Sequence, residues 1–186
     1  MTDFAQHFSQ ALPYDEFLNK YGSDAHRSRW AAMRDRISLT DAQNQLLASF
    51  KREMKVLVMA GAWCGDCVEQ CPIFDHFAAA CDRIHIRYVD RDDCGDLNQE
   101  LVVCGAARVP QVVFLSEDDH PVGRYGDRTL SKYRDMAASL AGVVCPSGIG
   151  PGEDLLAAVV QDWLNEFERI QLILRTSGRL REMYGD

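Results

Sequence analysis

The stretch of sequence that decides the fold is Gly61-Ala62-Trp63-Cys64-Gly65-Asp66-Cys67. It follows an apolar run, Val56–Ala60, which predicts a buried strand. After it, apolar residues at 68, 74, 77 and 78 predict a helix. A strand that leads into Cys-x-x-Cys at the start of a helix is the arrangement of a redox-active dithiol. The sequence therefore predicts thiol–disulfide chemistry at this point of the chain.

The spacing of the two cysteines fits that chemistry. Residues three apart on a helix have Cβ atoms about 5–6 Å apart, near enough to form a disulfide after a small adjustment. Cys64 stands at the helix start, where unpaired backbone N–H groups and the helix dipole stabilise a thiolate. We predict that Cys64 is the nucleophile and that Cys67 is the resolving thiol. The charge of Asp66 opposes a neighbouring thiolate, so we predict that Asp66 tunes reactivity.

Length, composition and net charge limit the classes of protein to which this chain can belong. A chain of 186 residues with 47% hydrophobic residues predicts one domain, or one domain with sizeable additions. No apolar run approaches the roughly 18 residues of a membrane span, and residues 1–7 lack the basic and apolar regions of a signal peptide. A net charge of −8 argues against a nucleic-acid or anionic-membrane partner. Seven cysteines, an odd number, fit a reducing compartment, so we predict a cytoplasmic location.

Helices and strands alternate after a helical beginning. Helices are expected at 13–21, 24–37 and 40–50, with Gly22 ending the first and a Thr40–Gln43 capping box opening the third. The expected order then is strand 55–60, helix 64–81, strand 84–89, short helix 96–103, strand 111–115, hairpin strand 122–125, and helix 130–140 ending at Gly142. This order predicts an α/β fold with a central mixed sheet flanked by helices.

The last part of the chain adds a linker and a long helix. Residues 143–152 are rich in Gly and Pro and predict a linker, followed by a helix over about 153–175. Its apolar stripe consists of Leu156, Val160, Trp163, Phe167, Ile170 and Leu174. The stripe either packs on the domain, which we favour, or forms a homodimer through this C-terminal helix. We therefore divide the chain into an N-terminal helical extension (1–39), a redox domain (40–142), and a linker with a C-terminal helical extension (143–186).

Four motifs in order give the chain a family resemblance. Trp63–Cys67 resembles the Trp-Cys-Gly-Pro-Cys site of thioredoxins, with Asp66 in place of proline. Pro72 stands where thioredoxins carry the proline of the active-site helix. Val109-Pro110 is similar to the family's Ile-Pro-Thr, and Gly126 matches a glycine beside the active site. The resemblance covers about residues 40–142 and implies a thioredoxin-like fold with helical extensions at both ends.

The resemblance implies a role for each matching residue. Trp63 flanks the site, Val109 offers its backbone to an extended substrate, and Pro110 follows a cis peptide bond and packs against the disulfide. Thioredoxins also carry a buried Asp six residues before the first cysteine, a position occupied here by Val58. The implied substrates are disulfide-containing proteins, with an upstream thiol reductase as electron donor and no bound cofactor. The alternative is a thioredoxin-like interaction or redox-sensing module without efficient turnover.

The remaining cysteines suggest a structural role. Cys71 extends the motif to C-x-x-C-x-x-x-C, but no second pair of spaced cysteines or histidines completes a zinc site, so we predict no metal. Cys71, Cys81, Cys94 and Cys104 are interpreted as small, mostly buried residues, and Cys145 lies in the linker.

Overall fold

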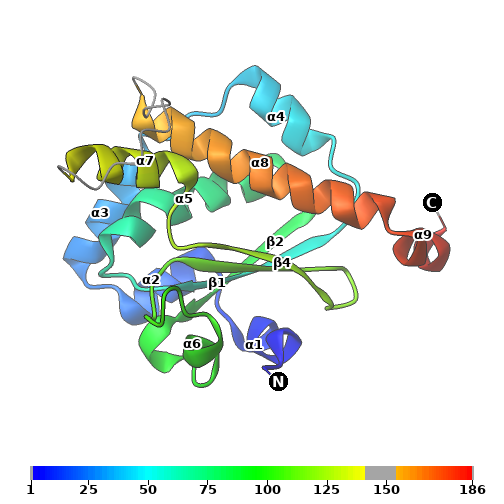
Figure 1. Ribbon diagram of the computed structural model, residues 1–186, viewed down its shortest axis with the longest axis horizontal. Helices are drawn as coiled ribbons and strands as arrows, with labels where there is room; N and C mark the ends of the chain where they lie inside the picture. Colours follow the sequence, from blue (N-terminus) through cyan, green and yellow to red (C-terminus); the bar gives the residue numbers. More distant parts are fainter. Residues whose placement is uncertain (1, 141–153, 186) are drawn as a thin grey trace.

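A mixed β-sheet forms the centre of the molecule (Figure 1). The computed structural model describes residues 2–140 and 154–185, and within these ranges the sheet has four strands in the order β2-β1-β3-β4. The strands are β1 (Met54–Ala60), β2 (Ile84–Asp90), β3 (Gln111–Leu115) and β4 (Pro121–Gly126). β1 is parallel to β2 and antiparallel to β3, and β3 is antiparallel to β4. This confirms the predicted α/β fold with a mixed sheet.

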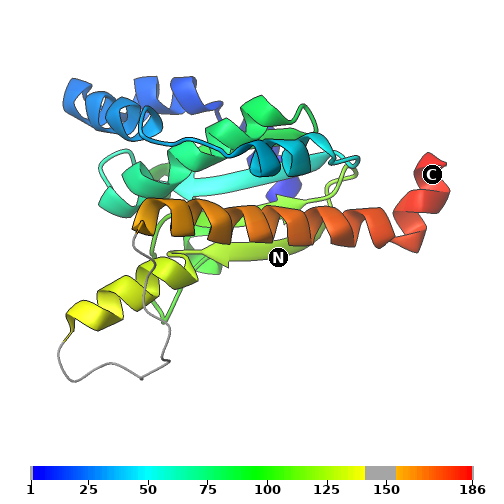
Figure 2. The same cartoon turned by 90° about the horizontal axis from the view of Figure 1, so that it is seen from above.

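The apolar strands are buried because helices cover both faces of the sheet. Val56 to Ala60 have no exposed surface, and all of β3 is buried, which explains why residues 56–60 and 112–115 form continuous apolar runs rather than alternating with polar residues. Figures 1 and 2 show α5 (Gly65–Ala80) and α8 (Leu155–Thr176) on one face, with α3 (Asp24–Arg34) beside α5 and α7 (Leu130–Ser139) beside α8.

The opposite face and the periphery carry the shorter elements. α1 (Phe4–Gln10) and α6 (Leu97–Glu100) lie below the sheet in Figure 1, and a 3-10 turn, Arg91–Asp93, follows β2. α2 (Tyr14–Tyr21) packs on β2 through Phe17, whose ring stacks on Tyr88 at 5.5 Å. α4 (Asp41–Ala48) leads into β1, and α9 (Gly178–Tyr184) ends the described chain. None of the described helices is long and apolar enough to cross a membrane.

Most predicted elements are present, with a few corrections at their ends. The Thr40–Gln43 capping box is confirmed by both of its hydrogen bonds. Gly22 does end α2, but it has an extended backbone with φ −95° rather than the left-handed conformation expected of a C′ glycine, because the chain turns at once into the cap of α3. The helix expected at 96–103 is limited to α6. The predicted linker 143–152, with Cys145, and the helix end at Gly142 lie outside the described residues.

One helix, α1, was not predicted. It has seven residues, of which none is fully buried, and its apolar face consists mainly of Phe4 and Phe8, which pack partly buried against the core. A capping bond stabilises its start, because the Asp3 carboxylate accepts from the backbone N–H of Gln6 at 2.9 Å.

The apolar stripe of α8 packs on the chain's own core. Val160, Trp163, Phe167, Ile170 and Leu174 are buried and Leu156 is half-buried. The ring of Phe167 lies 5.1–5.8 Å from the rings of Phe74, Phe77 and Phe114. The preferred interpretation of the stripe is therefore confirmed. A homodimer through this helix stays a prediction, and it would have to use the exposed side that carries Leu172 and Ile173.

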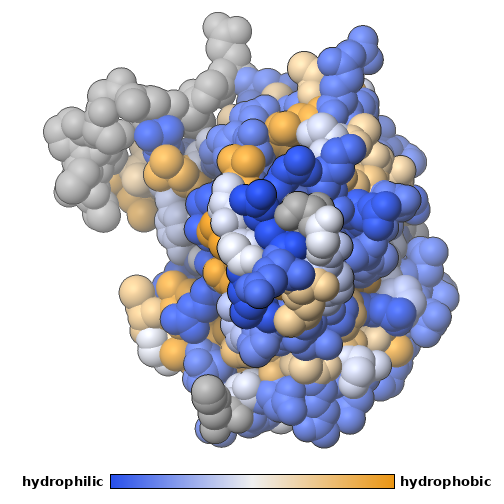
Figure 3. All heavy atoms as spheres, turned by 90° about the vertical axis from the view of Figure 1, so that its right-hand side faces the viewer, coloured by the Kyte–Doolittle hydropathy of each residue, from blue (hydrophilic) through white to orange (hydrophobic). Residues whose placement is uncertain are grey.

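α9 closes the end of the molecule that Figure 3 faces. This end is mostly hydrophilic, with small apolar patches between the polar side chains. The Arg179 guanidinium pairs with Asp118 in the turn between β3 and β4, with Nη2 3.1 Å from Oδ1. The pair attaches the end of the chain to the β-hairpin.

Because α8 packs on the core by one face, we expect two substitutions on this helix to have very different effects on the free energy of unfolding. Phe167→Ala should lower the free energy of unfolding by about 3–5 kcal/mol, because it leaves a cavity between α5, α8 and the sheet. Leu172→Ala removes a side chain that is 54% exposed and should change the free energy of unfolding by less than about 0.5 kcal/mol. Urea denaturation of both variants checks this, and equal effects would contradict the packing described.

Candidate active site

Cys64 is the N-cap residue of α5, directly after the turn that leaves β1. Its backbone N–H donates to the Gly61 carbonyl at 3.0 Å, and its carbonyl accepts the first helical bond from Val68 at 3.0 Å. The Cys64 side chain is partly exposed, whereas Cys67, one turn into the helix, is fully buried. Of these two cysteines, Cys64 is therefore the one that is accessible from solvent.

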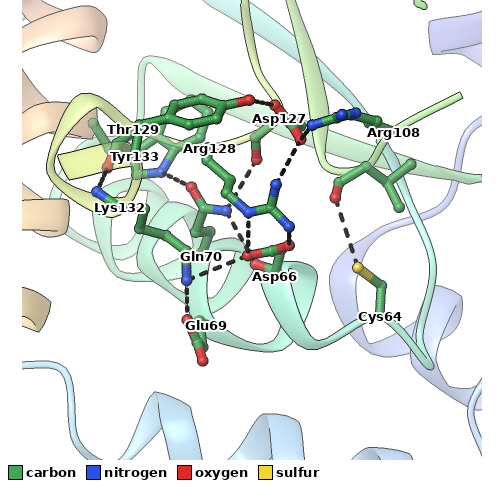
Figure 4. A network of polar contacts seen from close by, with 12 residues as sticks. Cys64, Asp66, Glu69, Gln70, Arg108, Asp127, Arg128, Thr129, Lys132 and Tyr133 are labelled. Atoms are coloured by element: carbon green, nitrogen blue, oxygen red, sulfur yellow. Dashed lines mark hydrogen bonds and ion pairs between the residues drawn. The ribbon is translucent and has the colours of Figure 1, made fainter. Parts of the chain in front are cut away.

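The Cys64 thiol faces the segment that contains Val109 and Pro110. Its Sγ donates a long hydrogen bond to the Val109 carbonyl, with an S···O distance of 3.6 Å (Figure 4). The Val109–Pro110 peptide is cis, as the resemblance implied. Gly126, at the end of β4, has φ +139°, and a Cβ there would lie 2.4 Å from the Pro110 carbonyl oxygen, so only glycine fits. The structure thus brings Cys64, Val109, Pro110 and Gly126 together.

Trp63 flanks the site and is 44% exposed. The guanidinium of Arg91 lies over its ring, 4.5 Å from the centroid, in a cation–π contact. The preceding residue is fixed from the N-terminal helices, because the buried indole N–H of Trp30 donates to the Ala62 carbonyl at 2.8 Å. α3 therefore supports the turn that presents Cys64.

The surroundings of the two thiols oppose ionisation. Burial raises the pKa of Cys67 well above its ordinary value, although the Gly61 N–H donates to its sulfur at 3.5 Å. The hydrogen bond to Cys67, together with burial, raises the pKa of Cys64 far above the thiol range. The backbone N–H groups of Asp66 and Cys67 lower it, as the helix-start argument expected, but they are outweighed. Val58, at the position where the resemblance implies a buried Asp, is a fully buried residue of β1.

Asp66 points away from the Cys64 sulfur and towards the loop after β4. Its carboxylate receives two hydrogen bonds from Arg128, Nη2–Oδ2 at 2.6 Å and Nε–Oδ1 at 3.1 Å (Figure 4). The ammonium of Lys132 lies 3.3 Å from Oδ1. The sequence suggested a charge that acts on the thiolate. The structure places that charge next to two cations, Arg128 and Lys132, and a tuning role for Asp66 stays a prediction.

A buried carboxylate that sequence reasoning missed lies beside Gly126. Asp127 is 2% exposed and pairs with Arg128 at 3.3 Å and Arg108 at 3.5 Å, and the Tyr133 hydroxyl donates to it. Burial favours the neutral acid, but the Tyr133 hydrogen bond and the two arginines outweigh it and hold the pKa of Asp127 below its usual value. The only signal in the sequence was an acid placed directly after the matched glycine.

The side chain of Gln70 links this loop to α5 and α8. Its Nε2 donates to the carbonyls of Asp66 at 3.2 Å and Asp127 at 3.1 Å. Its Oε1 accepts from the indole N–H of Trp163 at 3.1 Å. Gln70 has no exposed surface, so these bonds satisfy an amide that has no access to water.

The other cysteines have surroundings that differ from those of Cys64. Cys71 is fully buried beside Cys67, Cys81 and Cys94 are buried, and Cys104 is exposed. All six cysteines of the described residues are free thiols. Within residues 2–140 and 154–185, no group of three or more His, Cys, Asp or Glu side chains is placed to hold a metal ion.

Comparison with known proteins adds to this geometry. A family model described as thioredoxin matches residues 11–140, more than half of the chain. The chain belongs to the thioredoxin family. The match begins before residue 40, so it includes α2 and α3, which lie in the segment 1–39 that we expected to be an extension outside the thioredoxin resemblance.

Solved structures show that the fold extends over nearly the whole thioredoxin-family chain. A Pseudomonas aeruginosa protein of unknown function, PA1234, has 20% sequence identity and a TM-score of 0.69, with 91% of this chain and 97% of that chain covered. An HIV epitope-scaffold has 19% identity and a TM-score of 0.66, with 95% and 100% covered. No curated protein sequence matches this chain. The terminal helices are therefore part of a fold found in other proteins.

Alkylation of the native reduced protein should modify Cys64 before Cys67 and Cys71, because only Cys64 of the three has exposed surface. Since its pKa is raised, the rate at Cys64 should still be increasing with pH above about 8.5, where an ordinary thiol is half ionised. Mass spectrometry of iodoacetamide-treated protein over a pH series checks both points. Earlier modification of Cys67, or a rate that levels off near neutral pH, would contradict this description of the thioredoxin-like site.

The close approach of Gly126 to Pro110 gives a second prediction. Gly126→Ala should lower the melting temperature, because the added Cβ has to displace the backbone that faces Cys64. Gly178→Ala serves as the control, since a Cβ there meets nothing within 4 Å. Thermal unfolding of the two variants tests this prediction. Equal melting temperatures would contradict it and would mean that the backbone at Pro110 can move aside at little cost in stability.

Proposed function

We propose that this protein is a thiol–disulfide oxidoreductase that reduces protein disulfides through a Cys64/Cys67 cycle. The observation that carries the proposal is the partly exposed Cys64 thiol at the start of α5, 3.6 Å from the Val109 carbonyl, with Cys67 buried behind it. Membership of the thioredoxin family supports the same chemistry.

In the proposed reaction the Cys64 thiolate attacks one sulfur of the substrate disulfide. A mixed disulfide forms between Cys64 and the substrate, and the other substrate sulfur leaves as a thiolate that takes up a proton. The Cys67 thiolate then attacks the Cys64 sulfur and releases the second substrate thiol. The enzyme is left with a Cys64–Cys67 disulfide, and the substrate has gained two electrons and two protons.

Return to the dithiol requires two electrons from outside the chain. We propose a dithiol reductase as the donor, since direct exchange with Cys64 needs no cofactor bound to this protein. We also propose that the protein works in the cytoplasm, where a reducing environment keeps structural thiols such as Cys71 and Cys81 reduced. Trp63, Val109, Pro110 and Gly126 are proposed to line the substrate site around Cys64.

The test is a pair of cysteine variants assayed with a protein disulfide and a dithiol supply. Cys64→Ser should abolish turnover, because the nucleophile is lost. Cys67→Ser should also stop turnover but should accumulate a mixed disulfide on Cys64, because nothing resolves it. Non-reducing gels and intact-mass measurement detect that adduct. An active Cys64→Ser variant, or an adduct on Cys67 in that variant, would overturn the roles assigned.

A second candidate function is a redox-sensing or interaction module without efficient turnover. It is favoured by one observation: burial raises the pKa of Cys67, and the position at which the resemblance implies an acid is occupied by the buried Val58. Removal of the Cys67 proton would then be slow. Repeated turnover with excess dithiol supports the enzyme, whereas a single stoichiometric reaction supports the module.

A further inference from the structure

The side chain of Arg128 lies between α5 and the loop after β4, the two segments on either side of the proposed substrate site. Figure 4 shows its guanidinium between the Asp66 carboxylate of α5 and the Asp127 carboxylate of the loop after β4. The fork to Asp66 has both N···O distances at or below 3.1 Å, and the contact with Asp127 is 3.3 Å. The Arg128 side chain is 23% exposed, so it is held largely within the protein.

These contacts connect the two segments that face each other across the site. Asp66 lies two residues after Cys64 on the first turn of α5. Asp127 follows Gly126, whose backbone is in close contact with the Pro110 carbonyl, and its carboxylate also pairs with Arg108, directly before Val109. A side chain that bonds to both Asp66 and Asp127 therefore also restrains the distance between the Cys64 sulfur and the Val109 carbonyl oxygen.

We propose that Arg128 is a positioning residue that sets the spacing between Cys64 and the Val109 backbone for an extended peptide disulfide. This inference rests on the proposed function. It also assigns a role to Asp66 within the Trp-Cys-Gly-Asp-Cys motif: the carboxylate anchors the start of the redox helix through Arg128 rather than acting on the thiolate by its charge.

The geometry separates this role from a purely electrostatic one. A planar guanidinium can bond to both oxygens of Asp66 and still donate to Asp127, whereas a lysine ammonium is a single point of charge. Lys132 already places a second cation 3.3 Å from Asp66. Arg128→Lys therefore keeps the charge at the site and removes only the fork.

The experiment compares two substrates with the full-length protein. One is a small aromatic disulfide that needs only Cys64, and the other is a peptide disulfide that would lie along Val109. In Arg128→Lys we expect kcat/KM for the peptide to fall by about tenfold through KM, within the range that small misplacements cause. The small disulfide should react at nearly the wild-type rate. Asp66→Asn should give the same selective loss, and the double variant should lose little more than either single variant.

Arg169→Lys is the matched control. Arg169 makes a similar fork to Glu166 on α8, with distances of 2.8 and 2.6 Å, but neither residue contacts α5 or the Val109 segment in the described contacts. This variant should keep both activities. Melting temperatures show whether Arg128→Lys still folds, and if it does not, Asp66→Asn takes its place, because asparagine keeps the size of the side chain and removes only its charge.

The outcomes distinguish the two proposals. If the wild-type protein reduces neither disulfide, the proposed function is wrong, and the role of Arg128 is overturned with it. If the wild type reduces both and the folded variants do so equally well, the function stands and only the positioning role is wrong. An equal loss for both substrates would also overturn it, since that result indicates an effect on Cys64 reactivity itself.

Discussion

The buried amide of Gln70 is the interaction on which the arrangement of the site depends. It has no contact with solvent, so its N–H groups and its oxygen must be satisfied within the protein. The partners are the carbonyls of Asp66 and Asp127 and the indole of Trp163. These belong to α5, the loop after β4 and α8. One side chain therefore holds together three segments that are far apart in the sequence.

Helices before and after the central domain support the segment around Cys64. From the N-terminal side, Trp30 of α3 bonds to the Ala62 carbonyl in the turn that presents Cys64. From the C-terminal side, Trp163 of α8 bonds to Gln70 and packs edge-on against Phe74 at 4.6 Å. A thiol placed at a helix start needs that helix held firmly on both sides, because small displacements change which groups can reach its sulfur. The match of the thioredoxin family model to α2 and α3 agrees with this view.

The sequence alone determined the fold class and the position of the dithiol. An apolar strand followed by Cys-x-x-Cys, a Val-Pro pair and a glycine after the hairpin are local patterns, and each was found in its expected place. The stripe of α8 was equally readable, because its period reflects burial along one face of one helix. The sequence did not show α1, because a helix of seven residues is too short for an apolar pair such as Phe4 and Phe8 to establish a helical period.

Only the tertiary structure decided what surrounds the thiols. Asp66 was readable as a charge near Cys64, but its partners Arg128 and Lys132 come from residues more than sixty positions later. The same holds for Asp127, whose burial depends on Gln70, Arg108 and Tyr133 meeting around it. The raised pKa of Cys64 likewise results from its contact with Cys67 and from burial, which outweigh the local helix-start N–H groups. Local patterns fix which residues form a helix or strand, whereas charge compensation and burial depend on segments that only folding brings together.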